Sequence, residues 1–234
     1  MAFSVVASTS KASSDGMAIT TDPINTIGAD LIVLVASWVT QALAEPSDSE
    51  SNTWTALTRQ LNGFNGISQI FYVEAPGTGS SHTFTFDVPG FPGLTLEPWV
   101  GVIALSGRKV SGSFDQESGN KDTSGLTSFQ PGSITPSENN AIWIVGGSAH
   151  VFGPGSIDSV DSPFSSHVLA DIWDSGNSLG GIMAWEIQTT ATARNPTVSW
   201  NTGDTVNLEG ATFLSEPAGA TGNPWYLYHQ LRRQ

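Results

Sequence analysis

Two stretches decide the fold of this chain: Asp30-Leu-Ile-Val-Leu-Val-Ala-Ser37 and Asn140-Ala-Ile-Trp-Ile-Val-Gly-Gly147. Each begins at Asp or Asn and continues as a short apolar run rich in β-branched residues, which is the pattern of a strand. Because the apolar residues do not alternate with polar ones, we expect both runs to be central strands covered on both faces.

Other blocks repeat at a similar spacing of about 110 residues. Thr83-Phe-Thr-Phe86 lines up with Thr197-Val-Ser-Trp200, and Val102-Ile-Ala-Leu-Ser106 lines up with Ala211-Thr-Phe-Leu-Ser215. The matched blocks are strand-like and the mismatches fall between them, as expected where strands are kept and loops drift. We therefore interpret the chain as an internal duplication.

Strand signals recur along the whole chain, and no segment has sustained helical periodicity. The sequence predicts an all-β protein: an antiparallel β-sandwich of jelly-roll type over residues 1–216, with half-repeats at about 1–110 and 111–216. Residues 1–20 have no clear counterpart before the second copy. This favours one sandwich in which the halves interleave, because a separate second half would lack an edge strand. Two small sandwiches in tandem are the alternative.

The composition excludes several classes of partner. Charged residues make up 12% of the chain, about half the usual share, and the formal net charge is −13. An acidic chain of this kind is unsuited to nucleic acid or to an anionic membrane surface. It has no cysteine, its longest apolar run is too short to span a membrane, and its first residues do not resemble a signal peptide. We expect synthesis in a host cytoplasm and no cofactor.

The tail at 217–234 lies outside the repeat and follows a linker rich in Gly, Ala and Pro. Aromatic side chains combined with arginine are typical of protein interfaces, so the tail is a candidate assembly anchor. The alternative is a last strand or short helix packed on its own domain. The predicted partner-binding residues are Trp225, Tyr226, Tyr228, Leu231, Arg232 and Arg233.

Three phenylalanines occupy loop tips rich in Gly, Pro or Asn: Phe64, Phe91 and Phe152. An apolar ring on such a tip either folds back onto the sandwich or contacts a partner or the face of a sugar. We take these three as candidate ligand-binding residues. In a carbohydrate-binding module, an exposed tryptophan such as Trp99 or Trp173 is a further candidate for stacking on a sugar ring.

Four other tryptophans, Trp54, Trp143, Trp185 and Trp200, fall on expected strands at matched positions of the repeat. They are expected in the core.

No catalytic motif has its required context. Gly176-Asn-Ser178-Leu-Gly180 matches the G-x-S-x-G pattern of serine hydrolases, but a strand is expected after it in place of the helix, and only His229 follows. We expect no enzyme and no catalytic residue.

Metal sites are also not expected. The four histidines are widely spread, without metal-binding spacing. Asp48-Ser-Glu-Ser-Asn52 alternates oxygen side chains as a calcium loop does, and Asp158-Ser-Val-Asp161 is its counterpart. Neither has the Gly and distant Glu of an EF-hand. Solvated turn carboxylates are the expectation, and a weak surface calcium site is the alternative.

Several strand blocks resemble a group of duplicated β-sandwich proteins that we associate with tailed-phage virions and with uncharacterised bacterial relatives. The resemblance covers roughly residues 3–216, rests on strand patterns and includes no catalytic motif. It implies a role on the virion surface, as capsid decoration or a tail-fibre module, with glycan binding as an added role. The blocks that carry it are Asp30-Leu-Ile-Val-Leu-Val-Ala-Ser-Trp38, Ser51-Asn-Thr-Trp-Thr55, Gln69-Ile-Phe-Tyr72, His82-Thr-Phe-Thr-Phe86 and Ile103-Ala-Leu-Ser-Gly107.

We therefore expect a non-enzymatic phage structural protein, located in the virion and contacting other virion proteins. A homo-oligomer is expected, most simply a trimer, with a cell-surface glycan as a further partner. A carbohydrate-binding module is the first alternative, and a polysaccharide-degrading enzyme is the second.

Overall fold

The computed structural model describes residues 2–13, 18–39, 43–61, 66–88, 98–151, 157–164, 166–173 and 178–216; among these, the side chains of 150, 151, 157, 158, 166–173, 178, 179 and 202–204 are not described. Within this part of the chain all regular elements are β-strands, and each pairs antiparallel with its neighbours. This confirms the predicted all-β antiparallel fold. The same residues contain no helix long and apolar enough to span a membrane.

The first half of the chain forms a six-stranded sheet around the apolar run at Leu31. The strand order is β1 (Ser4–Ala12), β9 (Trp99–Ser106), β3 (Leu31–Val39), β7 (Gly66–Glu74) and β5 (Thr55–Ala56), with β6 (Gln60–Leu61) also paired to β7.

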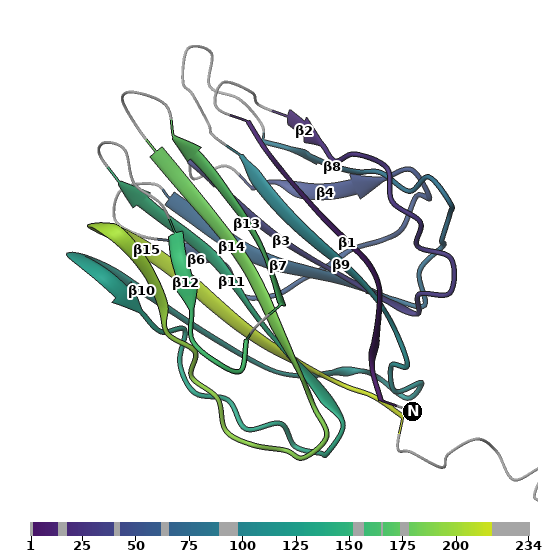
Figure 1. Cartoon of the computed structure of the whole chain (residues 1–234). Coiled ribbons are helices and arrows are strands. Elements are labelled where there is room, and N and C mark those ends of the chain that lie inside the picture. The colour runs from purple at the N-terminus through teal and green to yellow at the C-terminus, as the bar shows by residue number, and fades with distance from the viewer. Residues whose placement is uncertain are drawn as a thin grey trace, which may run out of the picture.

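A three-stranded sheet covers one face of this first sheet (Figure 1). Its order is β2 (Ala18–Thr20), β8 (Phe84–Asp87) and β4 (Glu45–Asp48). The alternating side chains Phe84 and Phe86 point into the core, as the pattern of that stretch predicts.

The second half forms another six-stranded sheet around the apolar run at Ile142. Its order is β10 (Phe114–Phe129), β15 (Val198–Leu214), β11 (Ala141–Val151), β14 (Ser178–Gln188) and β13 (Ser166–Trp173), and β12 (Ile157–Val160) also pairs with β15.

The two six-stranded sheets have corresponding strand orders. In the first, Leu31 of β3 lies opposite Leu105 of β9. In the second, Ala141 of β11 lies opposite Leu214 of β15. Each sheet takes its strands from one half, so the halves face one another as whole sheets, and the expectation that they interleave is wrong. Many pairs join strands that are far apart in the chain, such as β1 with β9 and β10 with β15, but no pair of the described strands joins one half to the other. The duplication as an origin remains a prediction.

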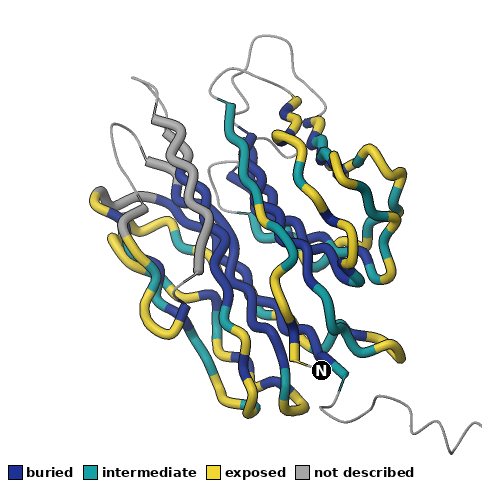
Figure 2. Tube along the Cα trace, turned by 45° about the vertical axis from the view of Figure 1, so that its right-hand side comes forward, coloured by how far each residue is buried: buried dark blue, intermediate teal, exposed yellow. Residues whose placement is uncertain are grey.

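Alternate residues of the central strands face two different cores. Leu31 and Val33 of β3 pack between the six-stranded sheets, whereas Ile32 and Leu34 pack toward the three-stranded sheet. In β11, likewise, Ile142 and Ile144 face the first sheet, and Trp143 and Val145 face a third core on the outer side. These eight side chains are fully buried, which confirms that both runs are covered on two faces (Figure 2).

The outer face of the second sheet is covered by the ends of its own long strands. The start of β15 pairs on one side with the end of β10, where Val198 lies opposite Phe129. On its other side it pairs with β12, where Val198 lies opposite Val160. Val198 and Trp200 then pack on the third core beside Trp143. The second half thus builds its outer layer from strands that continue out of the main sheet, whereas the first half uses separate strands.

Candidate functional site

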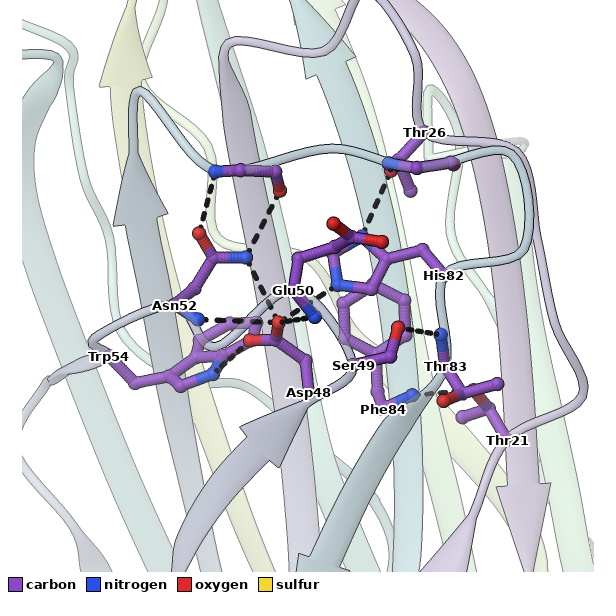
Figure 3. A network of polar contacts seen from close by, with 12 residues as sticks. Thr21, Thr26, Asp48, Ser49, Glu50, Asn52, Trp54, His82, Thr83 and Phe84 are labelled. Carbon is purple, nitrogen blue, oxygen red and sulfur yellow. Dashed lines mark hydrogen bonds and ion pairs between the residues drawn. The ribbon is translucent and has the colours of Figure 1, made fainter.

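A network of polar side chains joins the ends of the strands in the three-stranded sheet (Figure 3). Asp48 is the last residue of β4, His82 precedes β8, and Thr26 follows β2. Because β8 pairs with both β4 and β2, these residues meet. His82 Nε2 lies 3.0 Å from Asp48 Oδ1, and His82 Nδ1 lies 2.9 Å from Thr26 Oγ1.

The Asp48 carboxylate is saturated with donors. Its Oδ1 accepts hydrogen bonds from the backbone N–H of Glu50 at 2.9 Å and from the side-chain amide of Asn52 at 3.1 Å, besides the His82 contact. Its Oδ2 accepts a bond from Trp54 Nε1 at 2.9 Å. Asn52 in turn bonds both backbone groups of Gly77. The network ties two loops to the sheet edge.

The order hydroxyl, imidazole, carboxylate is also that of a hydrolase triad. Here the side chains of His82 and Asp48 have no exposed surface, and Thr26 is equally buried. The Thr26 hydroxyl also accepts a bond from the backbone N–H of Gly79 at 3.1 Å. A nucleophile must reach its substrate, so this triad is structural: a buried and well-bonded polar network that rigidifies its surroundings.

The expectation of solvated turn carboxylates is wrong for Asp48, whose side chain is fully buried, but Glu50 and Asp161 are exposed as expected. Both oxygens of Asp48 already accept hydrogen bonds from the protein, so this carboxylate is not a free calcium ligand. In the counterpart loop, Asp161 Oδ1 accepts a bond from the Thr197 backbone N–H at 2.9 Å. Among the described residues no group of three or more His, Asp or Glu side chains is placed to hold a metal.

A polar layer lies between the two six-stranded sheets, at one end of their shared core. On the first sheet, Ser37 lies opposite both Trp99 and Ser68. On the second, Glu209 and Asn207 continue the face of β15 that carries the apolar contacts with the first sheet. The layer contains four buried atoms without a hydrogen-bond partner: Ser37 Oγ, Trp99 Nε1, Asn207 Oδ1 and Glu209 Oε2.

Glu209 connects the two sheets. Its Oε1 accepts bonds from Ser68 Oγ at 3.0 Å and from the Gln60 backbone N–H at 3.2 Å. Burial raises the pKa of Glu209 from 4.5 to about 8, and the hydrogen bonds from Ser68 and from the Gln60 backbone only partly oppose this rise. At neutral pH the side chain is therefore a neutral acid within the interface.

The second half has an ion pair in its outer layer. Arg194 donates from Nε at 2.7 Å and from Nη2 at 2.8 Å to the two carboxylate oxygens of Glu186. The hydrogen bonds that Arg194 donates to the Glu186 carboxylate raise the pKa of Arg194. Arg194 bridges to Ile134, just as His82 bridges to Ile24 in the first half, but its side chain is 28% exposed.

A groove opens beside the junction of β10 and β15. It has a volume of about 360 Å³, near the lower limit for ligand pockets. None of its five lining side chains carries a charge. They are Asn120, Ser128, Phe129, Gln130 and Thr197.

The structure tests several residue predictions. Trp143, Trp185 and Trp200 are buried and Trp54 packs against the first core, as predicted. The expected exposure of Trp99 is wrong: its ring is fully buried because it closes over Gly181, where an added Cβ would lie 2.2 Å from the ring.

Ser178 begins strand β14, and a strand replaces the helix that a nucleophile elbow needs, as the sequence indicated.

The remaining candidate residues lie outside the description. Phe64, Phe91 and Phe152 fall in segments that are not described, and so does the whole tail with Trp225, Tyr226, Tyr228, Leu231, Arg232 and Arg233. The Trp173 side chain is also outside the described part. All of these remain predictions.

Sequence reasoning missed Glu209 and the groove. One acid among 21 carries no signal of its burial. Its position offers the only hint: it shares the inward face of a strand with Ala211 and Phe213. The groove residues come from three separated positions, which no spacing pattern connects.

No family model matches the chain, and no curated protein or solved structure gives a significant match.

Proposed function

We propose that the protein is a non-enzymatic structural module of a tailed-phage virion, acting as capsid decoration or as part of a tail fibre. The burial of Asp48 and His82 is the observation that carries the non-enzymatic part. Because both side chains are fully buried, a substrate cannot reach this hydroxyl–imidazole–carboxylate arrangement. The negative net charge of the chain disfavours binding to DNA, which suits a protein that does not contact the packaged genome.

The edge strand β10 supports a role in assembly. It spans sixteen residues with mostly exposed side chains, and in the described chain it pairs only with β15. A long free edge presents backbone groups on which another chain can pair. The tail at 217–234 supplies the proposed anchor, and other virion proteins and further copies of this chain, most simply three, are the proposed partners.

The experiment is a comparison of molar mass in solution for the full chain and for a chain ending at residue 216. Light scattering should show an oligomer that becomes a monomer on truncation, with an unchanged thermal unfolding temperature. A truncated chain that remains oligomeric and still decorates particles would overturn the anchor. Release of reducing ends from polysaccharides by the full chain would overturn the non-enzymatic assignment.

A further inference from the structure

The groove beside β10 and β15 arises from an irregular strand pairing. Asp122 lies opposite Val206 and Leu126 opposite Asp204, but Ser128 lies opposite Ser199. The register shifts twice, first with the extra residues on β10 and then with the extra residues on β15, so the strands leave the regular ladder where they pass from the main sheet into the outer layer (Figure 1). Such irregularities redirect side chains and open concave surfaces.

The polar groups of the groove are held in place by their own hydrogen bonds. Gln130 Nε2 donates to Thr197 Oγ1 and to the Asn195 backbone oxygen, both at 3.0 Å. Asn195 Nδ2 donates back to Gln130 Oε1 at 3.0 Å, and Asn120 Nδ2 donates to the Gln130 backbone oxygen at 3.3 Å. A ligand meets side chains that are already ordered, which lowers the entropy lost on binding.

Phe129 adds an aromatic ring to this polar surface. One side of the ring packs on the third core, and the residue is only partly buried. The C–H face of a sugar can lie on such a ring while its hydroxyls bond to neighbouring amides and hydroxyls. An anion would find no positive charge among the lining residues. A purely apolar ligand would find only one apolar side chain, Phe129, among the five lining residues.

We propose that this groove binds a neutral carbohydrate of one or a few sugar units. The assignment goes beyond the structural role, because it holds whether or not the chain assembles on a particle. The proposed sugar site lies on the second half of the chain, and it does not use Phe64, Phe91 or Phe152.

The test uses the full chain and calorimetric titration with neutral mono- and disaccharides of glucose, galactose, mannose and N-acetylglucosamine, chosen after a glycan-array screen. Gln130→Ala and Thr197→Val should each weaken binding about tenfold or more, as expected when polar groups that contact a ligand are lost. The thermal unfolding temperature should stay within a few degrees of the wild-type value.

Matched controls exist for both variants. Gln116→Ala removes an exposed glutamine at the other end of β10, and Thr83→Val changes the threonine that lines up with Thr197 in the first half. Both should bind as the wild type does. The proposal is overturned if no neutral sugar binds at millimolar concentration, if binding survives both groove variants, or if sulfated or sialylated glycans bind more tightly. None of these outcomes changes the molar mass of the full chain or of the chain ending at residue 216. The sugar-binding proposal and the assembly proposal can therefore fail separately.

Discussion

The two halves of the molecule share a strand order but differ in their outer layers. In the first half, a separate three-stranded sheet seals the polar network of Asp48 and His82 completely. In the second half, the bent ends of β10 and β15 form the outer layer, Arg194 stands where His82 stands in the first, and a neutral groove opens beside them.

This difference shows which features a shared topology constrains. Both halves keep apolar residues on the two faces of the central strand, because burial of apolar surface supplies most of the stability. The polar side chains at the strand ends are free to differ. One half uses them to fix its loops, and the other leaves part of them open to solvent, where they are available to a ligand.

The largest expected effect comes from opening the sealed network. Asp48→Ala leaves the buried donors of His82 and Trp54 without their acceptor. We expect the free energy of unfolding to fall by about 3–5 kcal/mol, as when one partner of a buried pair is removed. Urea denaturation measures this change.

Asp22→Ala is the control, because that exposed carboxylate pairs with Lys11 on the surface and should contribute less than about 1 kcal/mol. Equal losses for the two variants would contradict the structural role of the network.

A second prediction concerns the interface that both halves share. The pKa of Glu209 is about 8 in the folded protein and 4.5 when exposed, so the folded state holds a proton that the unfolded state releases between these values. The contribution to stability is therefore complete below pH 4.5 and is lost as pH rises toward 8 and beyond. The loss reaches at most about 5 kcal/mol, and less once the structure relaxes.

Glu209→Gln should remove this pH dependence, since an amide matches the neutral acid in shape and does not titrate. Urea denaturation of both proteins from pH 6 to 9 isolates the Glu209 contribution as the difference between the two curves. Parallel curves would show that Glu209 is ionised in the fold and that the interface tolerates its charge.

The smallest effect is expected at the ion pair of the second half. Arg194→Lys replaces a two-point contact with Glu186 by a single one in a setting that is only partly buried. The unfolding free energy should fall by less than about 1 kcal/mol, as measured by thermal unfolding. If Arg194→Lys lowered the unfolding free energy as much as Asp48→Ala does, the buried network of the first half and the exposed ion pair of the second would contribute equally to stability.

Much of the fold follows from local patterns in the chain. The unbroken apolar runs at Leu31 and Ile142 predicted strands covered on both faces. Threonine and phenylalanine alternate over 83–86, which is the pattern of a strand with Phe84 and Phe86 on its buried face. Such patterns reflect a side-chain period of two, which sequence displays directly. The pattern cannot tell which sheet covers which face, so separate and interleaved halves were both compatible with it.

The candidate sites depended on contacts between distant residues. Asp48 looked like a solvated turn residue, because its partner His82 is brought beside it only by the pairing of β8 with β4. From the sequence, Trp99 was a candidate for stacking on a sugar. In the fold its ring packs over Gly181, a contact that the sequence does not indicate.

The amino-acid sequence alone determined the strand class, the repeated apolar blocks and the acidic, cysteine-free surface, since each depends on composition or on neighbours along the chain. Only the tertiary structure decided that the halves stack as whole sheets, that Glu209 is a buried neutral acid and that the ends of β10 and β15 frame a groove. Burial, pKa and concave shape depend on residues brought together across the fold, and their positions follow from packing that local pattern does not encode.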